Sequence, residues 1–168
     1  WKFSEFKPQQ EAIIDAVLTN EDCIALLPTG GGKSICFQIP ALIKEGICIV
    51  VSPLIALMQD QVNALKDKGI KAMALTSGFS YEDIDRMLDN CIYGNYKFLY
   101  LSPERLQQDL VQERIKQMNV NLIAVDEAHC ISQWGHDFRP EYRDIKLLRT
   151  LHPNVNVIGL TASATAKV

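Results

Sequence analysis

The chain has 168 residues, of which 48% are hydrophobic and 22% charged, and 17 Lys+Arg against 20 Asp+Glu give it a formal net charge of -3. This composition is that of one ordinary globular domain that can bury a core, and it excludes collagen-like, disordered and disulfide-stapled classes. The longest uncharged stretch, residues 150–166, contains His152, Pro153 and Gly159, so we expect no membrane-spanning helix. The first residues show no basic region before an apolar run, so we expect no signal peptide and a cytoplasmic protein.

Taken in chain order, apolar runs of strand length alternate with segments of helical period. The runs are apolar on both faces, as in strands of a covered parallel sheet, and they are Cys23–Leu27, Ile47–Ser52, Ala72–Leu75, Phe98–Leu101, Leu122–Asp126 and Val155–Thr161. The predicted helices are Pro8–Leu18, Ser34–Lys44, Leu54–Lys68, Tyr81–Cys91, about Gln107–Met118, and Pro140–Leu151. This alternation predicts one doubly wound α/β domain, with a mostly parallel sheet and helices on both faces. Ligands of such sheets bind beyond the carboxyl ends of the strands.

The five cysteines form an odd set without CxxC spacing, and most lie among apolar neighbours. We expect them to behave as small hydrophobes, which suits a reducing compartment. A zinc site built with histidines from elsewhere in the fold is conceivable but lacks the paired spacing that such sites show.

A glycine-rich segment follows the first predicted strand, with the sequence Leu27-Pro28-Thr29-Gly30-Gly31-Gly32-Lys33-Ser34. Successive glycines allow backbone N–H groups to surround an anion, and the helix that follows directs its N-terminus at the same point. Lys33 is predicted to reach the β and γ phosphates of a nucleotide, and the Ser34 hydroxyl to ligate Mg²⁺. The strict P-loop pattern has glycine where this chain has Leu27. The alternative is a glycine-rich turn without a ligand.

Two adjacent carboxylates, Asp126 and Glu127, follow another apolar strand, and His129 comes two residues later. Carboxylates at the end of a buried strand are costly unless they meet a cation or transfer a proton. With a phosphate loop in the same sheet, Asp126 is predicted to hold Mg²⁺ and Glu127 to orient and deprotonate the attacking water. His129 is a candidate for coupling near the γ-phosphate. The alternative is a pair of solvated loop acids.

These motifs and several others resemble those of RecQ-family DNA helicases of superfamily 2. The most specific match is Asp126-Glu127-Ala128-His129 followed by the aromatic-rich string Cys130–Pro140. The remaining matches are Phe6-Lys7-Pro8-Gln9-Gln10, Pro28–Ser34, Ser52–Met58 with Asp60-Gln61, Ser102-Pro103-Glu104-Arg105 and Thr161-Ala162-Ser163-Ala164-Thr165. The resemblance implies a RecA-like P-loop NTPase domain, the first of the two in a RecQ helicase core.

The resemblance also implies roles for residues that the pattern alone would not single out. Gln10 would read the adenine edge, because an amide offers both a donor and an acceptor, with Phe3 and Lys7 beside the ring. The family usually has arginine where this chain has Lys7, which weakens the expected stacking. A second departure is Ser163, where the family usually has threonine.

DNA contacts are expected from three places. Trp134 and Phe138 could stack on single-stranded bases, with Arg139 supplying charge, although burial in the core is the alternative for the two aromatic rings. By resemblance, the segments that contain Ser52 and Arg105 touch the DNA backbone. Arg143, Lys146 and Arg149 are instead expected to form a solvated helix face.

The function implied is that of an ATP-dependent 3′-to-5′ DNA helicase, using ATP and Mg²⁺, acting in DNA recombination and repair in the bacterial cytoplasm. The partners implied are single-stranded and duplex DNA and a second RecA-like domain of a longer chain, which would supply an arginine finger. Alone, the chain is expected to be monomeric and to hydrolyse ATP poorly. Two alternatives stay open: a translocating ATPase that does not unwind, and a non-catalytic binding module.

Overall fold

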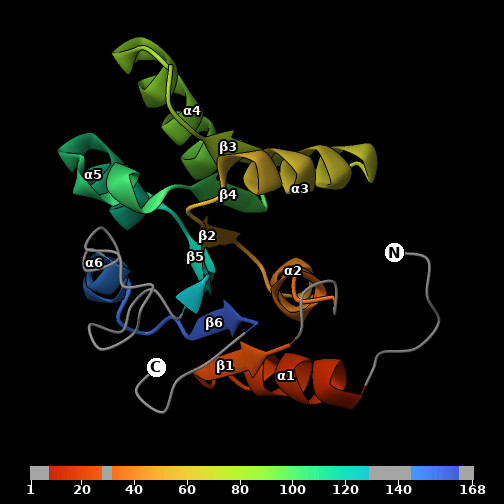
Figure 1. The fold of residues 1–168 in the computed structure, drawn as a ribbon. Coiled ribbons are helices and arrows are strands. Elements are labelled where there is room, and N and C mark those ends of the chain that lie inside the picture. The colour runs from red at the N-terminus through yellow and green to blue at the C-terminus, as the bar shows by residue number, and fades with distance from the viewer. Residues whose placement is uncertain (1–7, 28–31, 129–144, 163–168) are drawn as a thin grey trace.

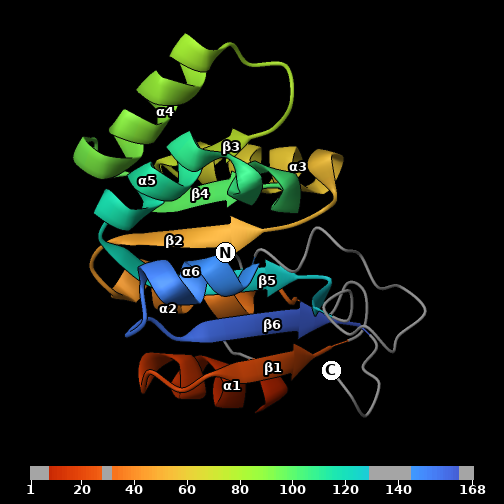
Figure 2. The same ribbon diagram turned by 90° about the vertical axis from the view of Figure 1, so that its left-hand side faces the viewer.

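The structure, a computed structural model, describes residues 8–27, 32–128 and 145–162. Within them six parallel strands form one sheet in the order β1-β6-β5-β2-β4-β3 (Figures 1 and 2). The strands are β1 (Cys23–Leu26), β2 (Ile47–Val51), β3 (Ala72–Leu75), β4 (Phe98–Leu101), β5 (Val120–Asp126) and β6 (Val157–Thr161). Because all the strands run the same way, their carboxyl ends lie along a single edge of the sheet.

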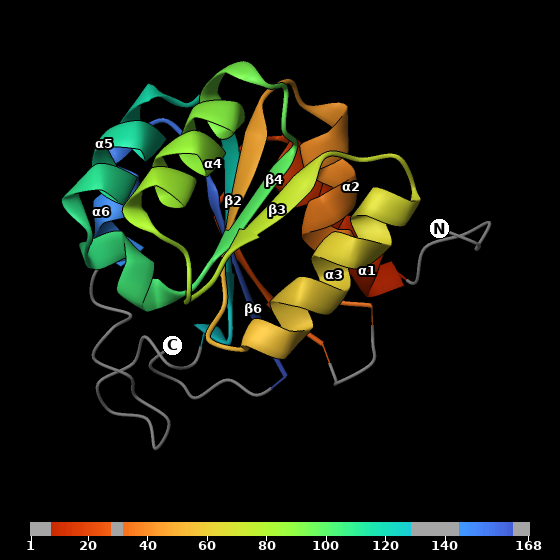
Figure 3. The same cartoon turned by 90° about the horizontal axis from the view of Figure 1, so that it is seen from above.

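Helices cover both faces of the sheet (Figure 3). One face carries α1 (Pro8–Leu18), α2 (Ile35–Ile43) and α3 (Ile55–Asp67). The other carries α4 (Tyr81–Tyr93), α5 (Asp109–Gln117) and α6 (Ile145–Leu151), and the 3-10 helix η1 (Pro103–Gln107) links β4 to α5. The predicted fold class, a parallel sheet with helices on both faces, is therefore confirmed.

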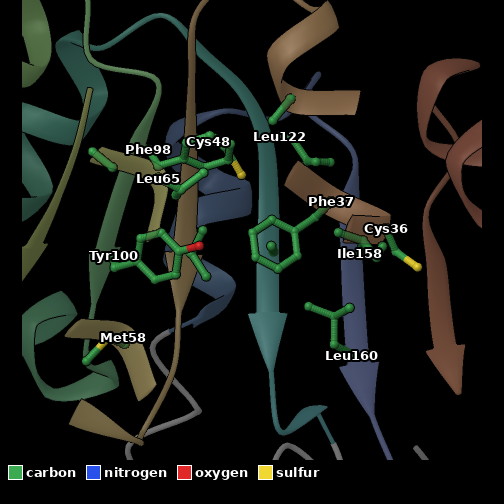
Figure 4. Close-up of a cluster of buried hydrophobic side chains, with 14 of the residues drawn as sticks. Cys36, Phe37, Cys48, Met58, Leu65, Phe98, Tyr100, Leu122, Ile158 and Leu160 are labelled. Atoms are coloured by element: carbon green, nitrogen blue, oxygen red, sulfur yellow. The ribbon is translucent and has the colours of Figure 1, made fainter. Parts of the chain in front are cut away.

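Each face of the sheet has its own hydrophobic core. The core under α1, α2 and α3 includes Phe37, Phe98 and Tyr100, whose rings meet with centroids 6.3–6.4 Å apart (Figure 4). The core under α4, α5 and α6 is largely aliphatic, with Leu99 and Leu101 fully buried. The strands are apolar on both sides because each side faces one of these cores.

The four cysteines in the described ranges are free thiols, and three of them are buried. Burial raises the pKa of the Cys36 thiol to about 11 and that of Cys91 to about 12, so both stay protonated at neutral pH. They pack as small hydrophobes, as predicted. None of the helices in the described ranges is long and apolar enough to cross a bilayer.

The element boundaries agree closely with the predictions, and α4 begins as expected. The Ser80 hydroxyl accepts a hydrogen bond from the Asp83 N–H at 3.1 Å, which caps the helix. Four differences are local: α4 ends two residues later than predicted, β5 begins two residues earlier, β6 begins two residues later, and α5 is preceded by η1 rather than starting at Gln107. The predicted start of the last helix at Pro140 lies outside the described residues.

Candidate nucleotide-binding site

A pocket of about 590 Å³ opens at the carboxyl edge of the sheet. Its lining comes from chain segments that follow β1, β2, β5 and β6, together with side chains from α2, α3 and β4. The polar residues of the lining are Lys33, Ser34, Ser52, Gln61, Tyr100, Asp126 and Glu127. The structure therefore brings together the predicted phosphate-binding pair and the predicted acidic pair, which lie more than 90 residues apart in the sequence.

Lys33 and Ser34 lie directly before α2, where the N-terminal end of that helix meets the pocket. The Cys36 N–H donates to the Lys33 carbonyl at 3.1 Å, and the Gln38 N–H donates to the Ser34 carbonyl at 2.9 Å. Ser34 is the N-cap residue, but its hydroxyl makes no capping bond to the helix. The helix thus holds the backbone of both residues without using the Ser34 side chain, and its positive end faces the pocket.

Asp126 ends β5 and is only 9% exposed. Burial raises the pKa of its carboxyl group, while the positive charge of Lys33 and hydrogen bonds from the Glu127 N–H and the Ser52 hydroxyl oppose that rise. The Glu127 N–H lies 3.0 Å from the Asp126 Oδ1. A carboxylate that has lost much of its hydration is stabilised by a nearby cation. The Asp126 carboxylate and the Ser34 hydroxyl, which line the same pocket, are oxygen donors that suit Mg²⁺ with bound phosphates.

Glu127 has a backbone φ of 55°, in the left-handed region that residues other than glycine rarely adopt. Such a conformation costs about 1–3 kcal/mol and persists only where the surroundings impose it. Here it turns the chain sharply at the end of β5, and the Glu127 side chain lines the pocket beside Asp126. Backbone strain of this kind is typical of residues in active sites.

Gln10 lies on α1 and, seen from the pattern alone, would be an ordinary helix-surface residue. In the structure it is only 4% exposed, and its Nε2 donates to the Gly32 carbonyl at 3.4 Å. Gly32 has a φ of 77°. Gln10 therefore lies against the end of the phosphate loop, next to the pocket.

Ser52 was expected to contact DNA, but the structure places it within the pocket. The side chain is 3% exposed, its oxygen accepts a hydrogen bond from the Leu54 N–H at 3.2 Å, and its hydroxyl bonds Asp126. Ser52 thus belongs with the acidic pair. The predicted DNA contact of the segment that contains Ser52 stays a prediction.

Arg105, also expected to contact DNA, lies on η1. Its guanidinium donates to the Thr76 carbonyl, just after β3, and to the Gln108 side chain at 3.0 Å. These bonds hold η1 against the end of a neighbouring strand. The guanidinium carries five N–H donors, so a phosphate contact is compatible with both bonds.

Other predicted residues lie outside the described ranges, and their roles stay predictions. They are Phe3, Lys7, Thr29, Gly30, Gly31, His129, Trp134, Phe138, Arg139 and Arg143. On α6, Lys146 and Arg149 are exposed, and Arg149 pairs with Asp22 at 2.7 Å, as expected for a solvated face.

The sequence analysis assigned no role to three polar side chains in or beside the pocket. Gln38 on α2 and Gln61 on α3 both hydrogen-bond the hydroxyl of Tyr100, which lies on β4. The available signal was a tyrosine within the apolar run of β4, because a buried phenol needs a partner.

Comparisons with known proteins agree with this geometry. The chain is 48% identical over 164 residues to the probable ATP-dependent DNA helicase RecS of Bacillus subtilis, covering 97% of this chain and 33% of that protein. It is 49% identical over 161 residues to the ATP-dependent DNA helicase RecQ of Bacillus subtilis, covering 95% of this chain and 27% of that protein. The chain thus spans about a quarter to a third of the length of the curated relatives it matches.

Solved structures share the fold. The helicase domain of Hef from Pyrococcus furiosus has a TM-score of 0.70 at 27% identity, covering 94% of this chain and 32% of that one. The helicase Lhr of Mycobacterium smegmatis, bound to single-stranded DNA and AMP-PNP, has a TM-score of 0.75 at 19% identity, covering 98% of this chain and 24% of that one. These likenesses confirm the predicted RecA-like fold.

The phosphate-binding pair and the acidic pair converge in one pocket of such a fold, and the similarity to RecQ helicases extends over nearly the whole chain. The family model of the DEAD/DEAH box helicases matches residues 7–168, which include both pairs. The chain therefore belongs to the DEAD/DEAH box helicase family.

Proposed function

We propose that this chain is the ATP-binding domain of a RecQ-type ATP-dependent DNA helicase that moves 3′ to 5′ on single-stranded DNA and unwinds duplexes. The observation that carries the proposal is the convergence of Lys33, Ser34, Asp126 and Glu127 on one pocket. The relatives named as ATP-dependent DNA helicases support the assignment to DNA and to the RecQ type.

In the proposed reaction, Lys33 binds the β and γ phosphates and stabilises the charge that develops on the transferred phosphoryl group. Ser34 and Asp126 would hold Mg²⁺, which supplies positive charge to the phosphates when bound. Glu127 orients the attacking water and accepts its proton, a role supported by its place in the pocket lining beside Asp126. Gln10 lies at the edge of the site, and we assign its amide to hydrogen bonds with the edge of the adenine.

The partners we propose are single-stranded and duplex DNA and a second RecA-like domain of the same protein. Arg105, Trp134, Phe138 and Arg139 are proposed to contact DNA, and the second domain to supply an arginine finger. A bacterial cytoplasmic location follows from the same assignment.

The test is Lys33→Ala in the whole protein, with ATP hydrolysis and strand displacement measured with and without single-stranded DNA. Loss of this charge from the transition state is expected to lower ATP turnover by about 100-fold or more and to abolish strand displacement. Lys116→Ala, which changes an exposed lysine on α5, is the matched control and should leave both activities unchanged.

Each outcome discriminates between functions. Wild-type turnover in Lys33→Ala would reject the catalytic role assigned to Lys33, and the absence of ATP turnover in the wild-type protein would favour a binding module. DNA-stimulated hydrolysis by the wild-type protein without strand displacement would leave a translocating ATPase that does not unwind.

A further inference from the structure

A chain of three polar side chains crosses the core beside the pocket. The Gln38 Nε2 donates to the Tyr100 hydroxyl at 3.0 Å, and that hydroxyl donates to the Gln61 Oε1 at 2.8 Å. Gln38 and Tyr100 are 5% and 1% exposed, and burial raises the pKa of the Tyr100 phenol well above its ordinary value, so the hydroxyl keeps its proton. The phenol oxygen is thus both an acceptor and a donor at neutral pH.

Packing does not require this polar chain. The Tyr100 ring lies 6.4 Å from that of Phe37 and 6.3 Å from that of Phe98, within an apolar cluster in which a phenylalanine ring would occupy the same volume (Figure 4). Replacing bonded buried polar groups by apolar groups of the same shape can be nearly neutral for stability. The polar groups therefore provide something other than burial, and what they provide is a directed link between α2 and α3.

One end of the link lies one helical turn from the phosphate-binding pair. The Gln38 N–H donates to the Ser34 carbonyl at 2.9 Å, so the side-chain amide and the backbone amide of the same residue join Tyr100 to Ser34. A shift of Gln38 is passed directly to the backbone that carries Lys33 and Ser34.

The other end of the link is α3, and a second set of hydrogen bonds connects the start of this helix to the pocket. Ser52, just before that helix, accepts a hydrogen bond from the Leu54 N–H and bonds Asp126. The helix is therefore connected through Gln61 to the phosphate loop and through Ser52 to the acidic pair. Both halves of the site are thus linked by hydrogen bonds to α3 and the residues just before it.

The first turn of α3 is exposed at the rim of the pocket. Leu54, Ile55 and Leu57 are 42%, 48% and 39% exposed, and Leu54 and Leu57 line the pocket itself. A partner bound at this rim would therefore contact the helix from which both links run.

We propose that Gln61, Tyr100 and Gln38 form a positioning relay by which α3 sets the place of Lys33 and Ser34. The relay rests on the proposed function, because its output is ATP hydrolysis stimulated by single-stranded DNA. None of the three residues is a catalytic residue. The relay acts on the extent to which DNA raises ATP turnover.

The test compares Tyr100→Phe, Gln61→Met and the double variant in the whole protein, with kcat and KM for ATP measured with and without single-stranded DNA. Each single change should lower the ratio of the DNA-stimulated kcat to the DNA-free kcat by about fivefold, the scale of one lost hydrogen bond. Gln61 and Tyr100 line the pocket, so the KM for ATP is measured as well and reports any separate effect on nucleotide binding. The double variant should lose no more than Tyr100→Phe alone, because the two side chains act in one chain. Tyr93→Phe removes the same hydroxyl from a ring that is 78% exposed and should behave as wild type.

Tyr100→Phe leaves the Gln38 amide without its partner and can lower stability, so thermal unfolding is followed in parallel. Gln61→Met keeps the bond between Gln38 and Tyr100 and serves as the second, milder variant. Equal losses with and without DNA, or additive losses in the double variant, would overturn the relay while leaving the proposed function intact. A wild-type protein without ATP turnover would instead overturn the proposed function, and the relay with it.

Discussion

Gly32 connects two parts of the nucleotide site that are far apart in the sequence. It has a φ of 77°, and a Cβ built there would lie 2.3 Å from the Gln10 Nε2. The position thus requires glycine twice, once for the left-handed backbone and once for the contact with α1. A P-loop motif predicts the glycine but not the second reason, which appears only when α1 is packed against the loop.

Gly69 offers a matched comparison, because it has a φ of 79° and no atom within 4 Å of the position of a Cβ. Gly69→Ala should lower the free energy of unfolding by about 1–2 kcal/mol, the cost of a left-handed alanine. Gly32→Ala should lower it by a further 1–3 kcal/mol, roughly the range for overpacking, and should also weaken nucleotide binding.

Chemical denaturation and nucleotide titration of the two variants check this. Gln10→Ala combined with Gly32→Ala should recover part of the stability, because it removes the side chain that the new methyl group meets. Equal destabilisation by the two glycine substitutions would show that Gln10 moves aside without loss, and that the contact with α1 does not constrain the loop.

At the scale of elements, Asn156 joins two helices to the start of β6. Its Nδ2 donates to the Val17 and Glu21 carbonyls, each at 3.1 Å, and its Oδ1 accepts from the Lys44 Nζ at 3.2 Å. The side chain is 3% exposed. It therefore accepts and donates hydrogen bonds at the ends of α1 and α2. These bonds lie at the edge of the sheet where β6 begins, opposite the edge that carries the pocket.

Asn156→Ala should lower the free energy of unfolding by about 1–3 kcal/mol, because it removes the hydrogen bonds to the Val17 and Glu21 carbonyls and the acceptor of the Lys44 ammonium group. Asn154→Ala, an exposed position two residues earlier, should change it by less than about 0.5 kcal/mol. Thermal or urea unfolding of both variants measures the difference. Loss of nucleotide affinity without loss of stability in Asn156→Ala would contradict a purely structural role.

The elements themselves could be predicted well where periodicity and composition point the same way. The strands Ala72–Leu75 and Phe98–Leu101 have the predicted bounds, because apolar residues on both faces have no other place than between two helical layers. The helix η1 was missed because a five-residue 3-10 turn has too few residues to show a period. Its Pro103 marks a turn in the sequence without telling which kind.

The candidate site could be predicted to the same extent and for a similar reason. Lys33, Ser34, Asp126 and Glu127 each lie at or after the end of a strand, and parallel strands bring their carboxyl ends to one edge. Tyr100 with its two glutamine partners could not be predicted in this way. Its partners lie 62 and 39 residues away on different helices, so no spacing in the sequence records the contact.

At the scale of the whole molecule, the site lies at an edge of the domain rather than between its cores. None of the four arginines that the structure describes is among the residues that line the pocket. They lie on α4 (Arg86), η1 (Arg105), α5 (Arg114) and α6 (Arg149), and Arg149 pairs with Asp22. The described part of the pocket therefore supplies one cation, Lys33, to the phosphates. In-line phosphoryl transfer needs more positive charge than this at the γ-phosphate.

This imbalance predicts how activity divides between this domain and the rest of the protein. Residues 1–168 alone should bind a non-hydrolysable ATP analogue but turn ATP over about 10³-fold or more slowly than the whole protein with single-stranded DNA, the range attributed to an arginine finger. Nucleotide titration and steady-state hydrolysis of the two proteins provide the comparison, and circular dichroism of the short chain verifies that it is folded. Turnover by the folded short chain within tenfold of the whole protein would show that the missing charge comes from residues of this domain outside the described ranges, with no need of a second RecA-like domain.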